Sequence, residues 1–432
     1  MKISVIGCGY VGLVSGFCFA DSGHKVTCID NNDQKIKLLK DNKVPIYEPG
    51  LNELLLKNIE NGNLAFELNI SENIKDSEIV LIAVGTPTGK NGDANLTFVY
   101  QCAREIAEFI SPNTQIIIKS TVPVGTCDEV ENIIKKHCIH SEFSVISNPE
   151  FLREGNAISD FINPDRVVIG TDDQTNKRIM INLYKSITNE DKILFTSRRS
   201  SELIKYASNS MLAMRIIFIN EIADLCEKIG ADVTDIAKGI GLDKRIGPHF
   251  LEPGPGFGGS CFPKDARALI ESGKKYDAPQ TLLESVILGN ENRKKNISKK
   301  ILNKLDEQTE NQIGILGVTF KAETDDMRES PSLIIIPNLQ ENGMNISVYD
   351  PEGEKEASKI LKDVNWKKTA YEAAENVDCL VILTDWEEFK NLDWISIYKT
   401  MRKPAWVFDT RICLDQEKIS SIGFNTWTLG RI

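Results

Sequence analysis

Residues 1–30 read MKISVIGCGYVGLVSGFCFADSGHKVTCID, and this stretch decides the fold. The apolar run at residues 2–6 predicts a short strand, and Gly7–Gly12 has the spacing GxGxxG of a tight turn. The apolar pattern up to Gly23 predicts a helix, and Lys25–Asp30 predicts a second strand. A strand, a glycine-rich turn, a helix and a second strand in this order indicate the start of a nucleotide-binding α/β domain.

Further strand-like runs alternate with helical patterns in the first half of the chain. They are Ile79–Val84, Gln115–Lys119, Phe143–Ser147 and Arg166–Ile169. Alternation of this kind predicts a parallel sheet with helices on both faces.

The middle of the chain has a different pattern. Residues 201–230 show helical periodicity without Pro or an internal Gly, with Ser201 as the expected N-cap and Gly230 as the stop signal. A helix of about 29 residues spans about 44 Å, which suits a connection between domains or subunits. Helical patterns continue at Ala266–Asp277 and Thr281–Leu305.

The last third repeats the opening pattern in weaker form. Residues 341–350 echo residues 21–30, because both stretches end a helix, contain a Gly and form a strand that ends in Asp. Residues 376–386 likewise echo residues 76–87. We therefore expect an α/β protein with two Rossmann-like doubly wound domains, joined by a central helical domain with a long helix. The expected ranges are 1–198 for the first Rossmann-like domain, 199–305 for the helical domain and 306–432 for the second Rossmann-like domain, whose ligand should differ because it lacks the three glycines.

Composition excludes several classes of protein. A net charge of -11 over 432 residues speaks against a nucleic-acid-binding surface. No segment reaches the roughly 20 consecutive apolar residues of a membrane span, and glycines interrupt the apolar stretch Ile3–Ala20. Ten cysteines without a CxxC pair indicate neither a disulfide framework nor a metal site, so we expect a reducing, cytoplasmic location.

The opening turn carries a specific cofactor prediction. Gly7 permits the turn, Gly9 lets a pyrophosphate approach the backbone, and Gly12 allows close helix packing. Asp30 is placed to accept hydrogen bonds from ribose hydroxyls and to repel a 2′-phosphate, which favours NAD over NADP. The nearby cation of Lys35 weakens this preference, and a Rossmann-like domain without a cofactor is the alternative.

Two later strand ends also carry polar groups. Thr86 and Thr121 follow predicted strands, so they are expected beside the cofactor, although caps and turns would have the same pattern. The segment Asn148–Gly155 places two carboxylates and a guanidinium at the same edge of the sheet, where a solvated loop is the alternative.

The strongest local signal lies at residues 253–265, where four glycines precede Cys261 and a predicted helix follows it. The positive helix end and Lys264 would both favour the thiolate and make Cys261 a nucleophile. Asp265 is placed to act as a base or to orient water, whereas a buried structural cysteine is the alternative.

Lys205 and Asn209 are four residues apart on the predicted long helix, so they share one face. A cation and an amide donor on one face suit the stabilisation of an oxyanion, although most pairs at this spacing are simply solvated.

The segment 243–265 around Cys261 resembles the UDP-glucose/GDP-mannose dehydrogenase family, and within it the UDP-glucose 6-dehydrogenases. The resemblance extends over the whole chain. It includes the segments 7–12, 45–51, 84–87, 119–123, 148–155 and 320–330, together with Lys205 and Asn209.

The resemblance implies a four-electron oxidation of UDP-glucose to UDP-glucuronate by two NAD, through a thiohemiacetal and a thioester on Cys261. The sulfur and the nicotinamide are expected to face the same sugar carbon. The implied catalytic residues are Cys261, Lys205, Asn209, Asp265, Thr121 and Glu150.

The resemblance also implies that residues 1–198 bind NAD, that residues 199–305 form the dimer and that residues 306–432 bind the UDP-sugar. It further implies individual binding residues. Those for NAD are Gly7, Gly9, Tyr10, Val11, Gly12, Asp30, Lys35, Thr86, Thr121, Glu154 and Arg328. Those for the UDP-sugar are Glu150, Phe151, Leu152, Arg153, Glu154, Lys205, Asn209, Arg245, Phe250, Leu251, Glu252, Pro253, Gly254, Gly258 and Lys321. Arg411 is a further candidate contact for the diphosphate. Arg245 would reach the active site of a neighbouring subunit, which implies a homodimer.

Two alternative functions stay open at this point. Related enzymes oxidise GDP-mannose or UDP-N-acetylhexosamines, although the acetamido-sugar enzymes tend to have His where this chain has Ser260. A nucleotide-binding protein without catalysis is the alternative from another class, and the presence of Cys261, Lys205, Asn209 and Asp265 together speaks against it.

Overall fold

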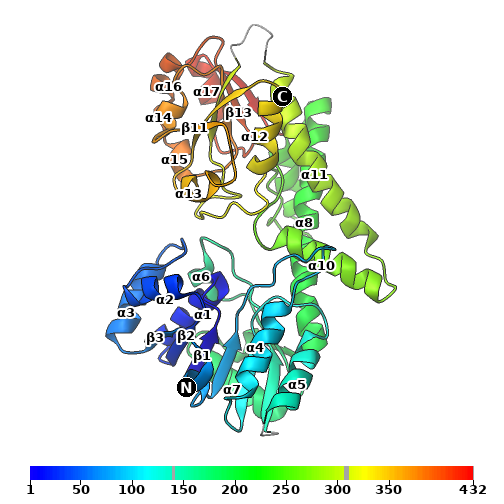
Figure 1. Cartoon of the computed structure of the whole chain (residues 1–432). Helices are drawn as coiled ribbons and strands as arrows, with labels where there is room; N and C mark the ends of the chain where they lie inside the picture. The colour runs from blue at the N-terminus through cyan, green and yellow to red at the C-terminus, as the bar shows by residue number, and fades with distance from the viewer. Residues whose placement is uncertain (139–141, 306–310, 432) are drawn as a thin grey trace. The chain divides into compact units, whose positions relative to one another are not determined.

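The computed structural model describes residues 1–138, 142–305 and 311–431. The chain forms two compact units, one of Met1–Ser208 with Glu271–Ala278 and the other of Asn209–Ile270 with Pro279–Ile432. The expected start of the third domain at residue 306 lies outside the described residues. Figure 1 shows the elements of each unit.

The first unit is built on a sheet of eight strands in the order β3-β2-β1-β4-β5-β6-β7-β8. The strands are β1 (Lys2–Ile6), β2 (Lys25–Ile29), β3 (Leu64–Glu67), β4 (Ile79–Ile82), β5 (Thr114–Ile118), β6 (Phe143–Ser147), β7 (Val167–Gly170) and β8 (Ile193–Thr196). The predicted parallel sheet is confirmed for β1 to β6. β7 differs, because it pairs with β6 in the antiparallel direction, through Ser147 and Gly170.

Helices cover both faces of this sheet, as predicted. They are α1 (Tyr10–Asp21), α2 (Asp33–Lys40), α3 (Leu51–Glu60), α4 (Thr97–Ala107), α5 (Thr126–His137), α6 (Ala157–Ile162) and α7 (Gln174–Tyr184), with short 3₁₀ turns at Ser71–Ile74 and Glu190–Lys192. Successive strand residues point to opposite faces, so Val5 packs in one hydrophobic cluster with α1 and α3, and Ile6 in another with α4 and α5. The strands are therefore apolar on both faces, as a sheet between two helical layers requires.

The long helix α8 (Arg198–Ile229) is continuous over 32 residues. It begins three residues before the predicted start, because Ser197 is the capping residue and its Oγ accepts the N–H of Ser200 at 3.2 Å. The prediction of Ser201 as the N-cap is wrong, since that hydroxyl is buried and bonds to Ser147 of β6. Gly230 ends the helix as predicted, with a φ of +77°.

The second unit combines the larger part of α8 and further helices with a second sheet. The helices are α9 (Val233–Gly241), α10 (Phe262–Lys275) and α11 (Thr281–Leu302), and α10 continues into the segment assigned to the first unit. The sheet has the parallel order β11-β10-β9-β12-β13-β14. Its strands are β9 (Gln312–Leu316), β10 (Asn345–Tyr349), β11 (Val364–Trp366), β12 (Cys379–Ile382), β13 (Trp406–Asp409) and β14 (Asn425–Thr428).

The helices around the second sheet are short. They are α12 (Ser332–Glu341), α13 (Glu354–Ala357), α14 (Ala370–Ala373), α15 (Glu387–Lys390), α16 (Trp394–Thr400) and α17 (Gln416–Ile422). The predicted internal repeat is confirmed, because the helix before β2 and the helix before β10 both end at a glycine with positive φ, Gly23 at +92° and Gly343 at +82°. β4 and β12 likewise occupy the same place beside the first strand of their sheets.

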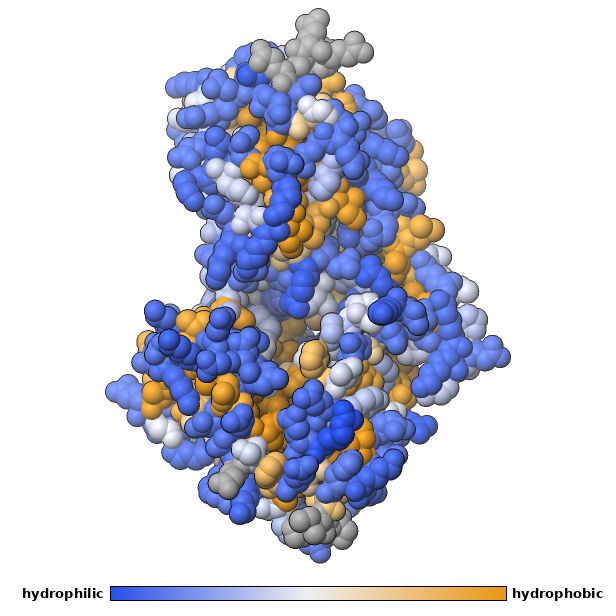
Figure 2. All heavy atoms as spheres, in the orientation of Figure 1, coloured by the Kyte–Doolittle hydropathy of each residue, from blue (hydrophilic) through white to orange (hydrophobic). Residues whose placement is uncertain are grey.

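Within the described ranges, no helix is both long and apolar enough to span a membrane. The face drawn in Figure 2 is mainly hydrophilic, with hydrophobic residues distributed among the polar ones.

Candidate functional site

The glycine-rich turn joins β1 to α1 and has little room for side chains at two of its glycines. A Cβ atom at Gly12 would lie 1.8 Å from the carbonyl oxygen of Gly7, and one at Gly7 would lie 2.7 Å from the carbonyl oxygen of Ala83. Gly9 is different, because no heavy atom lies within 4 Å of the position of its Cβ. Its backbone at the start of α1 is therefore open to a ligand, and the helix N-terminus favours an anion there.

Asp30 lies at the end of β2 and completes this turn. Its carboxylate accepts the backbone N–H groups of Cys8 at 2.8 Å and of Asn32 at 2.9 Å. The ammonium of Lys35 lies 3.7 Å away. A carboxylate has about four acceptor positions, so Asp30 keeps capacity for the hydroxyls of a ribose.

Glu48 is a residue of this region that the sequence reasoning missed. Its buried carboxylate accepts the N–H groups of Gly155 at 2.6 Å and of Ala157 at 2.7 Å, at the start of α6. It also accepts the hydroxyl of Tyr10, which belongs to the glycine-rich turn. Glu48 therefore connects the turn to the segment that follows Glu154. The motif at residues 45–51 contributes to the family resemblance, but its sequence does not identify the partners of Glu48.

Two predicted residues at the strand ends are neighbours. The hydroxyl of Thr86 donates to the backbone carbonyl of Thr121 at 2.9 Å, and Ser120 donates to the carbonyl of Val84 at 2.7 Å. The loops after β4 and β5 are thus bonded to each other at the edge of the sheet where parallel α/β domains bind ligands.

Glu150 and Lys205 form a buried ion pair. The ammonium lies 2.9 Å from the carboxylate, and each side chain is only 4% exposed. Burial by itself raises the pKa of Glu150, but Lys205 and the N–H of Leu152, which donates at 2.6 Å, outweigh burial and lower the pKa below its ordinary value. The carboxylate is therefore held in its charged form, next to a cation.

The rest of the segment 150–154 is arranged around this pair. The ring of Phe151 lies against the guanidinium of Arg166 at 3.8 Å and against the ammonium of Lys205 at 5.3 Å. Arg153 bonds to Asp160 through its side chain and through its backbone N–H. The guanidinium of Arg153 thus holds the loop to α6, which is a structural role that the sequence did not suggest. Glu154 is half-buried. Burial raises the pKa of Tyr10, and the charges of Glu48 and Glu154 raise this pKa further.

Cys261 immediately precedes α10, as predicted. Its side chain is half-buried, its sulfur lies 3.4 Å from the hydroxyl of Ser260, and its carbonyl accepts the N–H of Asp265 at 2.8 Å. The first turn of a helix presents positive backbone N–H groups, which favour a thiolate at this position.

Asp265 is fully buried and joins two of the predicted residues. It accepts the amide of Asn209 at 2.6 Å and the ammonium of Lys264 at 2.5 Å. Lys264, which was expected to act on Cys261, is therefore paired with Asp265. Lys205 and Asn209 lie on one helix as predicted, but Lys205 pairs with Glu150 and Asn209 pairs with Asp265.

Three polar residues that the sequence did not single out hold the loop before Cys261. Asn220 of α8 accepts the N–H of Gly254 at 2.8 Å, and Arg293 of α11 donates to the carbonyl of the same glycine at 3.0 Å. Asn290 of α11 bonds to both backbone groups of Phe257, at 2.8 Å and 3.0 Å. The backbone at residues 253–259 is buried and needs such partners.

The same loop packs on the segment 320–330. The N–H of Gly259 donates to the carbonyl of Arg328 at 2.7 Å, and a Cβ at Gly258 would lie 2.5 Å from the carbonyl oxygen of Glu329. The side chain of Arg328, a predicted NAD contact, pairs with Asp326 at 2.7 Å. Both glycines are therefore required by close packing.

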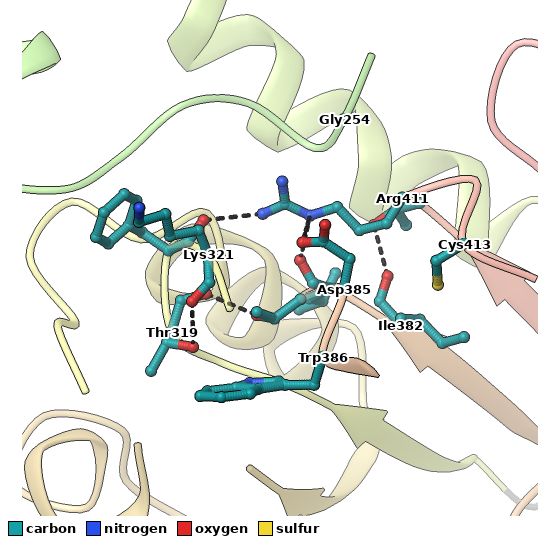
Figure 3. A network of polar contacts seen from close by, with 12 residues as sticks. Gly254, Thr319, Lys321, Ile382, Asp385, Trp386, Arg411 and Cys413 are labelled. Carbon is teal, nitrogen blue, oxygen red and sulfur yellow. Dashed lines mark hydrogen bonds and ion pairs between the residues drawn. The ribbon is translucent and has the colours of Figure 1, made fainter. Parts of the chain in front are cut away.

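Figure 3 shows the surroundings of Arg411. The guanidinium donates to the carbonyl of Leu383 at 2.7 Å and to that of Phe320 at 2.9 Å. A Cβ at Gly254 would lie 3.4 Å from Nη1 of Arg411. The structure therefore brings Gly254 and Arg411 together, next to the turn that carries Lys321.

The remaining predicted substrate residues lie between α9 and the cysteine loop. Arg245 pairs with Asp243 at 2.5 Å, and its side chain is 89% exposed. Phe250 has a φ of +60° and packs edge-on against Phe262. Leu251 is a core residue and Glu252 is exposed.

Of the described residues, no group of His, Cys, Asp or Glu is arranged to hold a metal ion.

Known proteins match the chain over its full length. Residues 1–188, 199–292 and 314–416 match the NAD binding, central and UDP binding domains of the UDP-glucose/GDP-mannose dehydrogenase family. A UDP-glucose 6-dehydrogenase of Rhizobium meliloti is 47% identical over 436 residues, with 100% of both chains covered. A UDP-glucose 6-dehydrogenase of Bacillus subtilis is 44% identical over 432 residues, with 100% of this chain and 93% of the relative covered.

A solved structure agrees with these matches. The UDP-glucose dehydrogenase of Pyrobaculum islandicum superposes with a TM-score of 0.90 at 34% identity, over 98% of each chain. The matches extend over the glycine-rich turn, the Glu150–Lys205 pair and the Cys261 loop alike. From its sequence and its fold, the chain belongs to the UDP-glucose/GDP-mannose dehydrogenase family.

Proposed function

We propose that the protein is an NAD-dependent UDP-glucose 6-dehydrogenase, which oxidises the 6-hydroxymethyl group of the sugar to a carboxylate. The observation that carries this proposal is the placement of Cys261 at the start of α10, followed by a buried Asp265 that is bonded to Asn209. A nucleotide-binding protein without catalysis has no use for such a nucleophile. In this proposal residues 1–198 bind NAD, residues 199–305 form the central helical domain and the dimer, and residues 306–432 bind the UDP-sugar.

The residues of the first unit fit NAD. Gly9 leaves space for the pyrophosphate at the start of α1, and Asp30 keeps acceptor capacity for the ribose. When bound, NAD accepts one hydride in each of the two oxidations.

The chain's own residues supply the remaining chemistry. In the first oxidation the alcohol loses a hydride and a proton, and the proton goes to a water held by Thr121, Lys205 and Asp265. The thiol of Cys261 gives its proton to water and adds to the aldehyde as a thiolate. The resulting oxyanion of the thiohemiacetal is stabilised by Lys205 and Asn209.

The second half of the reaction releases the acid. Loss of a second hydride from this oxyanion converts the thiohemiacetal into a thioester. Water, activated near Asp265 and Glu150, then breaks the C–S bond, which frees the carboxylate and restores the thiol of Cys261. Covalent capture explains why one site can oxidise twice without releasing an aldehyde.

Stoichiometry tests this proposal directly. The expected result is two NADH for each UDP-glucose consumed, measured by absorbance against product quantified by chromatography. Cys261→Ala should abolish formation of UDP-glucuronate while NAD binding is retained, and Cys138→Ala, which removes another half-buried thiol, should leave turnover unchanged. One NADH per sugar, or full turnover by Cys261→Ala, would refute the covalent route.

The choice of sugar is tested by substrate competition. The relatives named above are UDP-glucose 6-dehydrogenases, and Ser260 stands where the acetamido-sugar enzymes tend to have His. We therefore expect the highest kcat/KM for UDP-glucose, with GDP-mannose and UDP-N-acetylhexosamines far lower. Equal turnover of GDP-mannose would overturn the assignment.

We also propose a homodimer formed through α8. This helix has a row of exposed apolar side chains at intervals of seven and four residues, Met211, Phe218, Leu225 and Ile229, each 51–64% exposed. Arg215 of the same helix holds the loop that carries Arg245, by bonds of 2.8 Å to the carbonyls of residues 246 and 247.

Two experiments test the dimer. Phe218→Glu should convert the dimer into a monomer in light scattering, because a charge then replaces a buried apolar contact. Mixing inactive Arg245→Ala and Cys261→Ala subunits should restore activity if Arg245 serves the neighbouring site, since one complete site then forms in each mixed dimer. Failure to recover activity in demonstrated mixed dimers would refute that role. We also propose a reducing, cytoplasmic location, because the mechanism requires Cys261 as a reduced thiol.

A further inference from the structure

Lys119, at the end of β5, carries a charge in the interior of the first unit. The residue is 4% exposed, and its ammonium donates to the side-chain oxygen of Asn148 at 3.2 Å and to the hydroxyl of Tyr184 at 3.1 Å. In the described part of the chain it has no carboxylate partner; both acceptors are neutral groups. Burying an ammonium without a carboxylate is unfavourable, whereas an apolar side chain of similar length would fill the same space at no such cost.

The partners of Lys119 form a closed network. Tyr184 donates its hydroxyl to Asn148 at 2.6 Å, and the amide group of Asn148 donates to the carbonyl of Val168 at 2.8 Å. The ring of Tyr184 packs edge-on against Phe19. Asn148 is the first residue of the segment 148–155, so this network fixes the backbone at the point where that segment leaves β6.

Glu150 follows Asn148 by two residues, and its carboxylate interacts electrostatically with Lys119 of this network. Lys119 is one of the cations that lower the pKa of Glu150, after the larger effects of burial and of Lys205. Burial lowers the pKa of Lys119 itself to about 7, with Glu150 opposing this change and Lys205 adding to it. Tyr184 is the other titratable group against Lys119, and burial keeps its pKa above the ordinary value. The guanidinium of Arg166, which lies against the ring of Phe151, also interacts electrostatically with Glu150. Below about pH 7, Lys119 therefore adds its charge to those of Lys205 and Arg166 around Glu150.

We propose that Lys119 is a positioning residue for Glu150, which anchors the start of the segment 148–155 through Asn148 and supplies a further positive charge, beside those of Lys205 and Arg166, that keeps the carboxylate ionised. The inference rests on the proposed role of Glu150 in activating water for thioester hydrolysis. Lys119 would make two separate contributions. Its hydrogen bonds to Asn148 and Tyr184 hold the backbone in place, and its positive charge acts on Glu150 without direct contact.

The charge predicts a change in the pH profile. At acidic pH Lys119 is protonated and lowers the pKa of Glu150, so removal of the charge raises that pKa and activity is lost at a higher pH. In Lys119→Met the acidic limb of log kcat against pH should move upward by about one pH unit, the size of effect expected for one charge at intermediate dielectric. Lys119→Gln, which is neutral but can still donate to Asn148, should show the same movement.

The anchor predicts a different result. Tyr184→Phe removes one acceptor of Lys119 and one donor to Asn148 but keeps the ammonium. In this variant kcat should fall severalfold at every pH, with the acidic limb unmoved and the KM for UDP-glucose little changed. Lys185→Met, which removes an exposed ammonium from the next residue along the chain, is the matched control and should behave as the wild type.

The melting temperatures of all variants at pH 7 identify folding effects. Lys119→Met should be no less stable than the wild type, because it no longer buries an ammonium. The inference is overturned if both neutral variants keep the acidic limb of the wild type, or if Lys185→Met moves it equally. Failure of the underlying function is distinguishable, because NADH per UDP-glucose would then differ from two in the wild type, whatever the pH profile.

Discussion

The two sheets repeat one topology, yet they use the aspartate after the second strand differently. Asp30 follows β2 and accepts two backbone N–H groups. Asp350 follows β10, is 5% exposed and accepts bonds from five residues of its own unit. These donors are Val318, Thr319, Glu352, Gly353 and Trp386. One carboxylate is therefore left with capacity for a ligand, and the other is saturated by the chain.

The preceding turns explain the difference. The first turn has glycine at three positions, and the space beside Gly9 is empty. In the second unit the turn begins at Gly317, with a φ of +83°, but continues with Val318, Thr319 and Phe320. The ring of Phe320 packs so closely on the cysteine loop that a Cβ at Gly259 would lie 2.8 Å from it. The same fold thus leaves space at this turn in one unit and packs against its own chain in the other.

The largest expected effect comes from closing the first turn. In Gly12→Ala the added Cβ would lie 1.8 Å from the carbonyl oxygen of Gly7, so the turn must open, at a cost of about 1–3 kcal/mol. We expect the kcat/KM for NAD to fall by about 100-fold or more, together with a lower melting temperature. Gly9→Ala is the matched control, because its methyl group meets no atom of the protein. It should keep the melting temperature of the wild type and weaken NAD binding about tenfold, measured by calorimetry.

Substitution of the two aspartates should have somewhat smaller effects, and each variant serves as the control for the other. Asp350→Asn loses charged acceptors for several buried donors and should lower the free energy of unfolding by about 2–3 kcal/mol, with the affinity for NAD unchanged. Asp30→Asn should change the melting temperature little, lower NAD affinity about tenfold and improve the relative use of NADP, because the negative charge is lost. If Asp350→Asn weakened NAD binding as strongly as Asp30→Asn, the contrast between the two turns would be wrong.

Periodic patterns made most of the fold predictable from the sequence. The strands β1, β2, β4 and β6 and the long helix have apolar runs of the right length, and the repeat after residue 341 identifies the second sheet. β3 and β8 were not predicted, because each is four residues long and partly polar. The start of α8 was misplaced because Ser197, Ser200 and Ser201 lie close together around it, and only the bond from Ser200 to Ser197 selects the cap.

The site was predictable where a residue type has a specific chemical use, as for the three glycines, Asp30 and Cys261. The residues that hold these groups in place were not. Asn290 and Arg293 lie in a polar stretch of a predicted helix, which looks like a solvated face until their bonds to the loop backbone are seen. The role of Glu48 was equally unpredictable, because the backbone N–H groups that it binds are more than a hundred residues away in the sequence. Such contacts depend on tertiary structure and leave no local signal.

The smallest expected effect concerns the connection between the first turn and the segment after Glu154. Tyr10→Phe removes a hydroxyl that donates to the buried carboxylate of Glu48, and a hydrogen bond to a charged group is worth about 1.5–3 kcal/mol at most. Because the two N–H donors to Glu48 remain, we expect only about a fivefold rise in the KM for NAD, with kcat nearly unchanged.

The second unit offers the control for this last change. Tyr349 donates its hydroxyl to Glu388 at 3.0 Å, the same pair of residue types at an exposed position. Exposed pairs contribute little, so Tyr349→Phe should leave both KM values and the melting temperature as in the wild type. Steady-state kinetics of the two variants side by side decide the matter. Equal behaviour would mean that Tyr10 does not connect the cofactor turn to the loop, and that the hydrogen bonds of Glu48 to the start of α6 are sufficient on their own.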